Sequence, residues 1–265
     1  MAILNGPLKN AKGIRQLVDQ IILERGPDEE IQAGVFEYFD TDLHKYHVTE
    51  RSHLSRLEIK SIARQLLEAL SITHKNHIVH TDLKPGNLVL SRFMKSSTAK
   101  LHIKIIDFGL ASIGDHDRQH LITNPCWRSP ESWLGMPWGP PADIWSFGAI
   151  IGSLLMEPGA MLFRPWGGVA NIPKEDQDRE FIRTLWTITP FPGAFLNKIP
   201  GEWRNVISKF TPKLAPTGEP TTLPFICSVF GMPDRDIEFV KDILQVDPDK
   251  RLTASQLLQH PWFDS

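Results

Sequence analysis

Four polar side chains in the first half of the chain are suited to the transfer of a phosphoryl group: Asp82, Lys84, Asn87 and Asp107. This reaction needs a base near the attacking hydroxyl, cations on the phosphate oxygens and accurate positioning, with little covalent help. Asp82 can take the hydroxyl proton, and Lys84 can reach the transferring phosphate as a point charge. Asn87 and Asp107 offer the hard oxygen ligands that magnesium prefers.

Three of these residues lie in one loop between two short apolar runs. Residues 78–79 and 88–90 are β-branched or aliphatic and predict buried strands. Pro85-Gly86 between them predicts a loop. A polar loop held between two anchored strands is typical of a functional site on a rigid scaffold.

The chain before this loop predicts two strands and a helix. Residues 14–23 alternate loosely in hydropathy and residues 31–39 are largely apolar, so both predict strands, paired antiparallel across a Gly-Pro-Asp turn. Residues 55–74 predict the clearest helix. Ser55 and Glu58 have the spacing of a capping box, and apolar residues follow the i, i+3, i+4, i+7 pattern of one buried face.

The chain after the loop predicts one more strand and then mainly helices. Residues 101–106 predict a short strand, and residues 142–156, apolar nearly all round, predict a buried helix. Residues 236–245 predict an amphipathic helix, and Thr253 with Gln256 forms a second capping box before a final short helix. A few strands followed mainly by helices indicate an α+β fold.

The composition indicates a globular protein without nucleic acid or a membrane as its main partner. The chain has 265 residues, 41% hydrophobic and 23% charged, which is enough to bury a core. Its net charge of −2 gives no polybasic character. Cys126 and Cys227 lie far apart, which fits a reducing compartment. The start lacks the pattern of a signal peptide, and the longest nearly apolar run, residues 144–156, is too short to span a bilayer. We expect an intracellular protein of the cytoplasm or the nucleus.

Five motifs in the right order resemble the eukaryotic protein kinase family. Residues 80–87, HTDLKPGN, are similar to its catalytic loop, and residues 107–109, DFG, to its metal-binding D-F-G motif. Residues 129–131, SPE, stand where the family has A-P-E, and residues 143–148 resemble the D-x-W-S-x-G opening of its central helix. Arg251 stands where a family arginine pairs with the A-P-E glutamate. Such a set does not arise by chance.

The resemblance implies a single protein kinase domain over residues 1–265. Residues 1–40 would form a partial β-rich small lobe with the hinge, and residues 41–265 a complete, mainly helical large lobe. It implies ATP and Mg²⁺ as cofactors and a protein substrate, with Asp82 as the base and Asn87 and Asp107 on the metal. Lys84 in a D-L-K-P-x-N loop implies transfer to serine and threonine.

The same resemblance assigns an ATP site around the hinge. Phe36 is the gatekeeper, and the backbone groups of Glu37 and Phe39 bond the adenine. Asp42 is positioned to reach the ribose, and Val89 forms the floor below the base.

Structural roles are implied for four further residues. His80 packs beneath the catalytic loop, Asp143 caps the backbone of that loop, and Glu131 pairs with Arg251. Thr81 replaces the usual arginine of the loop. Together with Arg128 before the S-P-E motif, it resembles the CMGC group, and within it the SR-protein kinases and their dual-specificity relatives. Without that arginine a phosphorylated activation segment loses its usual partner, so we expect activity independent of such phosphorylation.

The pattern departs from the family at the start of the chain. Residues 1–81 contain no Gly-rich strand pair, no V-A-I-K lysine and no helix with the paired glutamate, so the resemblance is to an N-terminally truncated domain. We therefore expect weak ATP binding, an exposed sheet edge and aggregation. Asn124 stands where the family usually has a threonine that bonds the catalytic residues. The alternatives are a pseudokinase or protein-binding module, and a truncated gene model or splice form; the oligomeric state stays open.

Overall fold

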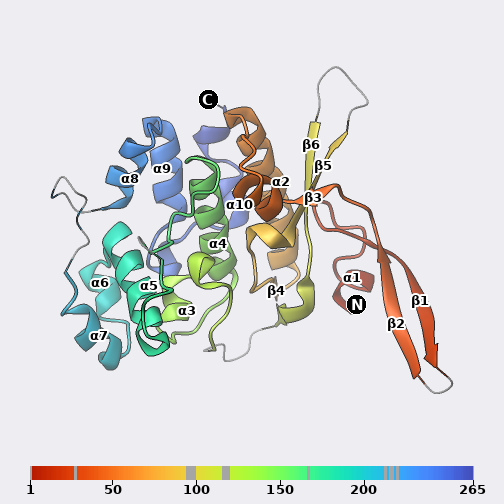
Figure 1. Ribbon diagram of the computed structural model, residues 1–265, viewed down its shortest axis with the longest axis horizontal. Coiled ribbons are helices and arrows are strands. Elements are labelled where there is room, and N and C mark those ends of the chain that lie inside the picture. Colours follow the sequence, from red (N-terminus) through yellow and green to blue (C-terminus); the bar gives the residue numbers. More distant parts are fainter. Residues whose placement is uncertain are drawn as a thin grey trace.

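The computed structural model describes residues 2–26, 29–93, 100–114, 120–165, 168–211, 214, 218 and 221–264. Figure 1 shows a body of helices with the strands along one side, and one long hairpin that extends away from it. The predicted α+β class is confirmed: a small sheet region adjoins a mainly helical lobe. No helix among the described residues is both long and apolar enough to cross a membrane.

The extended hairpin consists of β1 (Leu17–Gly26) and β2 (Glu29–Phe36), which follow the short helix α1 (Ala2–Asn5). The predicted antiparallel pairing is confirmed. The predicted start of the first strand at residue 14 is wrong, because Ile14 is fully buried and bridges to Ile105 on another sheet. Burial against that sheet takes Ile14 out of the hairpin.

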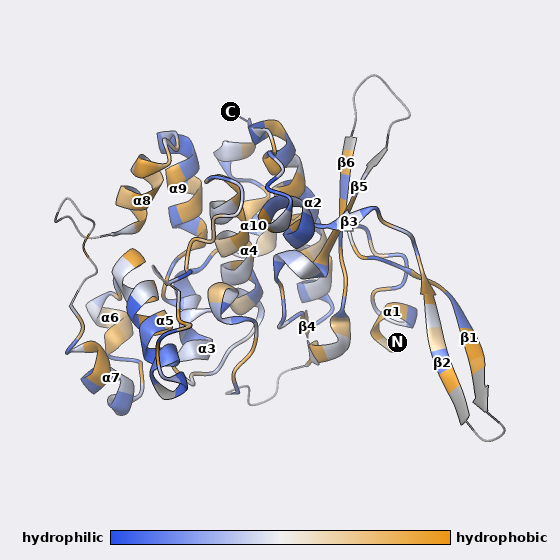
Figure 2. Cartoon of the chain, viewed as in Figure 1, coloured by the Kyte–Doolittle hydropathy of each residue, from blue (hydrophilic) through white to orange (hydrophobic). Residues whose placement is uncertain are grey.

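The hairpin leaves apolar side chains in solvent. Val18 is 64% exposed and Ile22 61% exposed, and Ile21, Leu23, Ile31 and Val35 are exposed as well. Figure 2 shows the orange, hydrophobic segments of β1 and β2 standing clear of the helical body. An uncovered apolar face of this kind marks an interaction surface or an aggregation liability, as expected from the sequence.

The first long helix packs against the three-stranded sheet that supports the catalytic loop. The helix α2 (Arg56–Lys75) begins at Ser55, and both bonds of the predicted capping box with Glu58 are present. The sheet has the order β3 (Thr41–Asp42), β5 (Leu88–Phe93), β6 (Lys100–Ile105). Gln65 of α2 reaches the sheet, donating to Leu101 O at 3.1 Å and accepting from Ile103 N at 3.3 Å. The helix and sheet are thereby fixed relative to each other.

The two runs that flank the catalytic loop are both strands, as predicted, but they belong to different sheets. The strand β4 (Ile78–Val79) pairs antiparallel with β7 (Ser112–Ile113), whereas β5 pairs with β3 and β6. The loop is therefore held at each end by a separate sheet.

The predicted buried helix is α4 (Pro140–Leu154), and nearly all of its side chains are buried. It begins earlier than predicted because proline is tolerated in the first turn of a helix. It packs closely on α9 (Asp234–Ile243). A Cβ atom at Gly148 would lie 2.5 Å from Ile243 Cγ2, so only glycine permits this approach.

The helix α5 (Lys174–Ile188) and several short helices complete the large lobe. Thr253 and Gln256 make the second predicted capping box, at the start of the final α-helix. These helices are α3 (Pro130–Trp133), α5 (Lys174–Ile188), α6 (Gly193–Leu196), α7 (Gly201–Ile207), α8 (Leu223–Val229) and α10 (Ala254–Leu257).

Candidate active site

Three of the four chemistry-bearing residues meet within the catalytic loop. Lys84 Nζ lies 2.6 Å from Asp82 Oδ2. Asn87 Nδ2 donates to the same oxygen at 3.0 Å and to Asp82 O at 2.8 Å. Because both side-chain contacts use Oδ2, the other carboxylate oxygen, Oδ1, can accept from a substrate hydroxyl. The Asp82 side chain is held in one orientation by a cation and an amide, as a general base requires.

The backbone of the loop rests on a buried carboxylate in the first turn of α4. Asp143 Oδ2 accepts from His80 N at 2.8 Å, and its Oδ1 accepts from Thr81 N at 3.0 Å. His74 Nε2 lies 3.0 Å from Oδ2. Thr81 has a φ of 67°, a left-handed conformation that is strained for a β-branched residue. The hydrogen bond to Asp143 offsets part of that strain and positions Asp82, the next residue.

The environment of Asp143 keeps its carboxylate charged. Burial alone would raise the pKa of this group, but the hydrogen bond from His74 and the nearby His80 outweigh it and hold the pKa below its ordinary value of 3.8. Since the folded pKa is lower than the unfolded one, the unfolded chain binds more protons at acid pH. The stabilisation from Asp143 is therefore present above about pH 4 and is lost as the pH falls through the folded pKa.

Replacing Asp143 with Asn is expected to lower the free energy of unfolding at pH 7 by about 2–3 kcal/mol, because a charged acceptor of three hydrogen bonds is lost. Urea unfolding at pH 7 and at pH 3–4 measures this. The Asn variant should lack the acid-dependent loss that Asp143 causes in the wild type. Asp234→Asn, at an exposed position in the first turn of α9, is the control and should change stability by less than about 1 kcal/mol. Equal pH profiles for wild type and Asp143→Asn would show that Asp143 is not the group responsible.

The D-F-G turn, residues 107–109, is joined to the catalytic loop. Ile106 N donates to Asn87 O at 3.0 Å. The His80 ring is fully buried, its Nε2 lies 2.8 Å from Ile106 O, and it makes an edge contact with Phe108 at 4.8 Å between centroids. Asp107 has a φ of 62°, a conformation that aspartate adopts more readily than most residues. These contacts are structural, and they bring Asn87 and Asp107 to the same end of the β5–β6 pair.

Asn87 and Asp107 together fit a magnesium ion. They supply an amide oxygen and a carboxylate, which are hard oxygen donors. Among the described residues, no group of three or more His, Cys, Asp and Glu side chains could hold a metal. A site with one or two protein ligands, completed by phosphate oxygens and water, is the arrangement magnesium commonly takes with nucleotides.

The residues predicted to bind ATP lie along the hinge and on β5. Phe36 ends β2, and Asp42 pairs with Val89 across β3 and β5, so the predicted ribose contact and adenine floor are neighbours. Glu37 Oε2 lies 2.6 Å from Lys104 Nζ and accepts from Gln16 N at 3.0 Å. These bonds anchor the hinge to β6 and to the segment before β1.

The structure adds contacts that the sequence did not predict. Asn124 does not reach across to Asp82; its Oδ1 accepts from Cys126 N at 3.4 Å. The preceding residue, Thr123, donates its hydroxyl to Thr81 O at 2.7 Å. The bond to the catalytic loop therefore comes from Thr123 and not from Asn124, the position that the family pattern indicates.

A buried ion pair joins the S-P-E motif to the end of the chain. Arg251 Nη1 and Nη2 donate to Glu131 Oε1 and Oε2 at 2.8 and 3.1 Å, and both side chains are 0% exposed. Arg251 also donates to Pro141 O at 2.6 Å. The arginine thus ties α3 and α4 to the segment that precedes α10.

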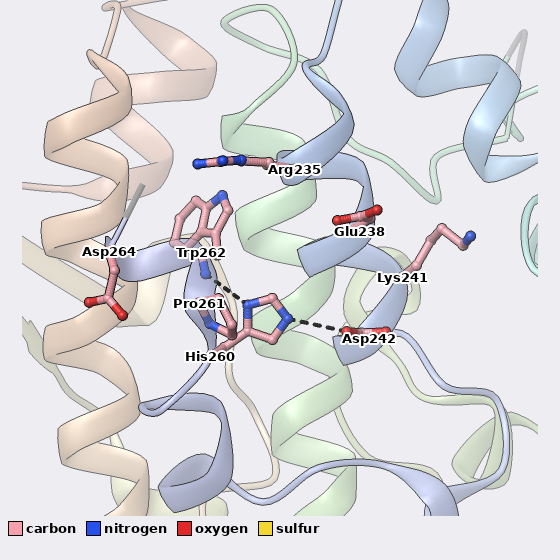
Figure 3. A pocket seen from close by; sticks show the side chains of 8 residues that line it. All are labelled: Arg235, Glu238, Lys241, Asp242, His260, Pro261, Trp262 and Asp264. Atoms are coloured by element: carbon pink, nitrogen blue, oxygen red, sulfur yellow. Dashed lines mark hydrogen bonds and ion pairs between the residues drawn. The ribbon is translucent and has the colours of Figure 1, made fainter.

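Two surface hollows differ in their relation to the loop. One hollow, of about 800 Å³, is formed by α9 and the C-terminal residues, and its lining side chains are drawn in Figure 3. His260 Nε2 lies 3.1 Å from Asp242 Oδ2 there. No catalytic-loop residue lines this hollow. A smaller hollow of about 450 Å³ is lined by Lys84 at one side and by Cys126, Trp127 and Arg164 elsewhere. Of these two hollows, only the smaller one is lined by residues of the catalytic loop.

A helical lobe that presents an Asp-Lys-Asn loop beside an Asp-Phe-Gly turn, with a small sheet region next to it, defines the protein kinase class. The protein kinase domain model matches residues 27–263. The chain belongs to the protein kinase domain family.

Individual relatives are consistent with this family. The chain is 32% identical over 236 residues to Cell division control protein 2 homolog 3 of Trypanosoma brucei brucei, covering 86% of this chain and 67% of the relative. It is 29% identical over 252 residues to Dual specificity tyrosine-phosphorylation-regulated kinase 3 of Rattus norvegicus, covering 86% of this chain and 40% of that protein. It is 30% identical over 211 residues to the DYRK-family kinase pom1 of Schizosaccharomyces pombe, covering 76% of this chain and 18% of that protein.

A solved structure shares the fold. The yeast RNA Pol II CTD kinase CTDK-1 complex contains a chain that superposes with a TM-score of 0.75 at 20% identity, covering 96% of this chain and 76% of that one. At this identity the likeness shows the fold alone. The predicted protein kinase family and fold are confirmed.

Proposed function

We propose that this chain transfers the γ-phosphoryl group of ATP to serine and threonine hydroxyls of a protein substrate. The observation that carries the proposal is the convergence of Lys84 and Asn87 on Asp82 Oδ2. A general base needs an oriented carboxylate, and phosphoryl transfer needs a cation beside it. The loop supplies both within a few ångströms.

Each residue has a role in the proposed reaction. Asp82 Oδ1 accepts the proton of the substrate hydroxyl, whose oxygen forms a bond to the γ-phosphorus as the bond to ADP breaks. Lys84 would contact the transferring phosphate, and Asn87 and Asp107 would hold magnesium. When bound, magnesium neutralises charge on the phosphate oxygens. Phe36, Glu37, Phe39, Asp42 and Val89 form the ATP site in this proposal, with Phe36 behind the base and Val89 below it.

Independence from activation-loop phosphorylation is part of the proposal. Thr81 Oγ1 donates to Leu110 O at 2.7 Å, and Thr81 O accepts from Thr123. These bonds connect the loop to the chain after the D-F-G turn and to the segment before α3. They support the idea that the neutral Thr81 holds the catalytic loop in position without a phosphate, whereas an arginine at this place would need a phosphorylated partner.

The surroundings support a peptide substrate in an intracellular setting. The hollow of about 450 Å³ beside Lys84 is lined by His44, Gly86, Trp127 and Arg164 among others, which offers both apolar and cationic contacts to a peptide. The two cysteines, both free thiols, support a reducing compartment, in the cytoplasm or the nucleus.

Magnesium-dependent ATP binding tests the proposed site. Magnesium-ATP at ten times its dissociation constant is expected to raise the unfolding temperature by about 3 °C, because ligand binding to the folded state adds free energy of unfolding. ATP with a chelator should give a smaller rise. Asp107→Asn should remove the magnesium-dependent part, and Asp234→Asn should retain it. The same shift in Asp107→Asn as in wild type would place the metal elsewhere.

A protein-binding module is the second candidate. The exposed apolar hairpin of β1 and β2 favours it, because it offers contact area to a partner. Absence of both phosphate transfer and a magnesium-dependent ATP shift would favour this candidate.

A further inference from the structure

An arginine already holds the hinge carbonyl that the proposed ATP site assigns to adenine. Arg15 Nε donates to Glu37 O at 2.6 Å. The Arg15 guanidinium carbon lies 5.2 Å from the centre of the Phe36 ring, within cation–π range. The side chain is therefore fixed by two contacts, one to the carbonyl and one to the predicted gatekeeper.

The position of Arg15 is set by the sheet, beside Phe36 of the proposed ATP site and beside the D-F-G turn. Its backbone N donates to Ile105 O at 3.0 Å, two residues before Asp107. Arg15 lines a cavity of about 230 Å³ together with Phe36, Asp107 and Phe108. The Arg15 side chain thus lies between the hinge carbonyl and the D-F-G turn.

The chemistry of this contact bears on the 6-amino group of adenine. Glu37 O is the hinge acceptor that a 6-amino donor would use. A hydrogen bond from a charged donor is roughly twice as strong as one from a neutral amino group. Arg15 takes one of the two lone pairs of Glu37 O, so the 6-amino group of adenine must either share this carbonyl with a charged donor or displace it. A purine without a 6-amino group has no hydrogen-bond donor at this position and does not compete with Arg15 for Glu37 O.

We propose that Arg15 is a specificity-determining residue of the nucleotide site that selects against a 6-amino purine by occupying Glu37 O. This inference rests on the proposed nucleotide site but not on phosphoryl transfer. It identifies Arg15 as a residue of this chain that would weaken adenine binding.

The test compares three ligands: adenosine, purine riboside, which lacks only the 6-amino group, and magnesium-ATP. Dissociation constants are measured by ligand-observed NMR for wild type and Arg15→Val. Val removes the donor and adds an apolar side chain beside Phe36 and Phe108, and Arg15→Ala serves as a second variant should Val disturb folding. Arg179→Val, on exposed α5, is the matched control.

Arg15→Val is expected to bind adenosine about tenfold more tightly than wild type, and purine riboside within twofold. Equal gains for both nucleosides would mean that Arg15 only fills space, and would overturn the proposal. No gain for adenosine, including no binding by either protein, would overturn it as well. A loss of magnesium-ATP affinity with adenosine unchanged would make Arg15 a phosphate anchor instead. Since the nucleosides carry no phosphate, these results are independent of whether the chain transfers phosphate.

Discussion

Replacing Asp82 with Asn is expected to lower the rate of phosphoryl transfer about 1,000-fold, within the range that general bases contribute. Asparagine has the shape of aspartate and its Oδ1 can accept from Lys84 and Asn87, so the loop keeps its conformation. Its amide cannot take the proton of the substrate hydroxyl. The loss should therefore appear in kcat, with the dissociation constant of magnesium-ATP within about threefold of wild type. Single-turnover transfer from γ-labelled ATP and equilibrium ATP binding measure the two quantities separately.

Two comparisons make the Asp82 result specific. Thermal unfolding of Asp82→Asn should match wild type closely, which separates a chemical loss from a folding defect. Asp234→Asn, the same substitution on the surface of α9, should leave transfer unchanged. Transfer by Asp82→Asn within threefold of wild type would remove Asp82 from the role of base.

Replacing Arg251 with Ala is expected to destabilise the chain by about 3–5 kcal/mol, because it leaves Glu131 as an unpaired buried charge. Both side chains are 0% exposed, and the pair is bidentate at 2.8 and 3.1 Å. Denaturant unfolding at pH 7 measures the change. Such a loss is a large part of the stability of an ordinary domain.

The matched control is an ion pair on the surface. Arg179 lies 3.7 Å from Asp176, with side chains 62% and 50% exposed, so Arg179→Ala should cost less than about 0.5 kcal/mol. The double variant Arg251→Met with Glu131→Leu should be more stable than Arg251→Ala, because it removes the buried charge along with its partner. A change below 1 kcal/mol in Arg251→Ala would show that Glu131 is neutral or solvated in the folded chain.

Local patterns predicted the elements that hold the site. The capping boxes at Ser55 and Thr253 and the apolar periodicity of α2 depend on residues three or four apart, so the sequence contains the whole signal. The catalytic loop could also be predicted from the sequence, because its residues are contiguous in the chain and their spacing forms a motif. The ends of the strands could not be predicted in this way. Ile14, for example, is buried against another sheet, where it bridges to Ile105.

Contacts between residues that are distant in the chain could not be predicted from a single sequence. Lys104 meets Glu37 at 2.6 Å and Arg15 meets Glu37 O at 2.6 Å, and no periodicity relates these positions. Likewise, β4 pairs with β7 rather than with the strand on the far side of the catalytic loop. The composition of a segment shows that it forms a strand, but its partner is set by the packing of the whole sheet region.

Product analysis tests the central claim most directly. The chain is incubated with magnesium-ATP and either of two peptides that differ only in carrying Ser or Tyr as the acceptor, and ADP and phosphopeptide are quantified by mass spectrometry. The proposed function predicts phosphoserine peptide and ADP in equal amounts, little phosphotyrosine, and formation of both products about 1,000-fold more slowly in Asp82→Asn. A chain that binds magnesium-ATP yet yields no phosphopeptide from either substrate would contradict the assignment of this catalytic loop to phosphoryl transfer.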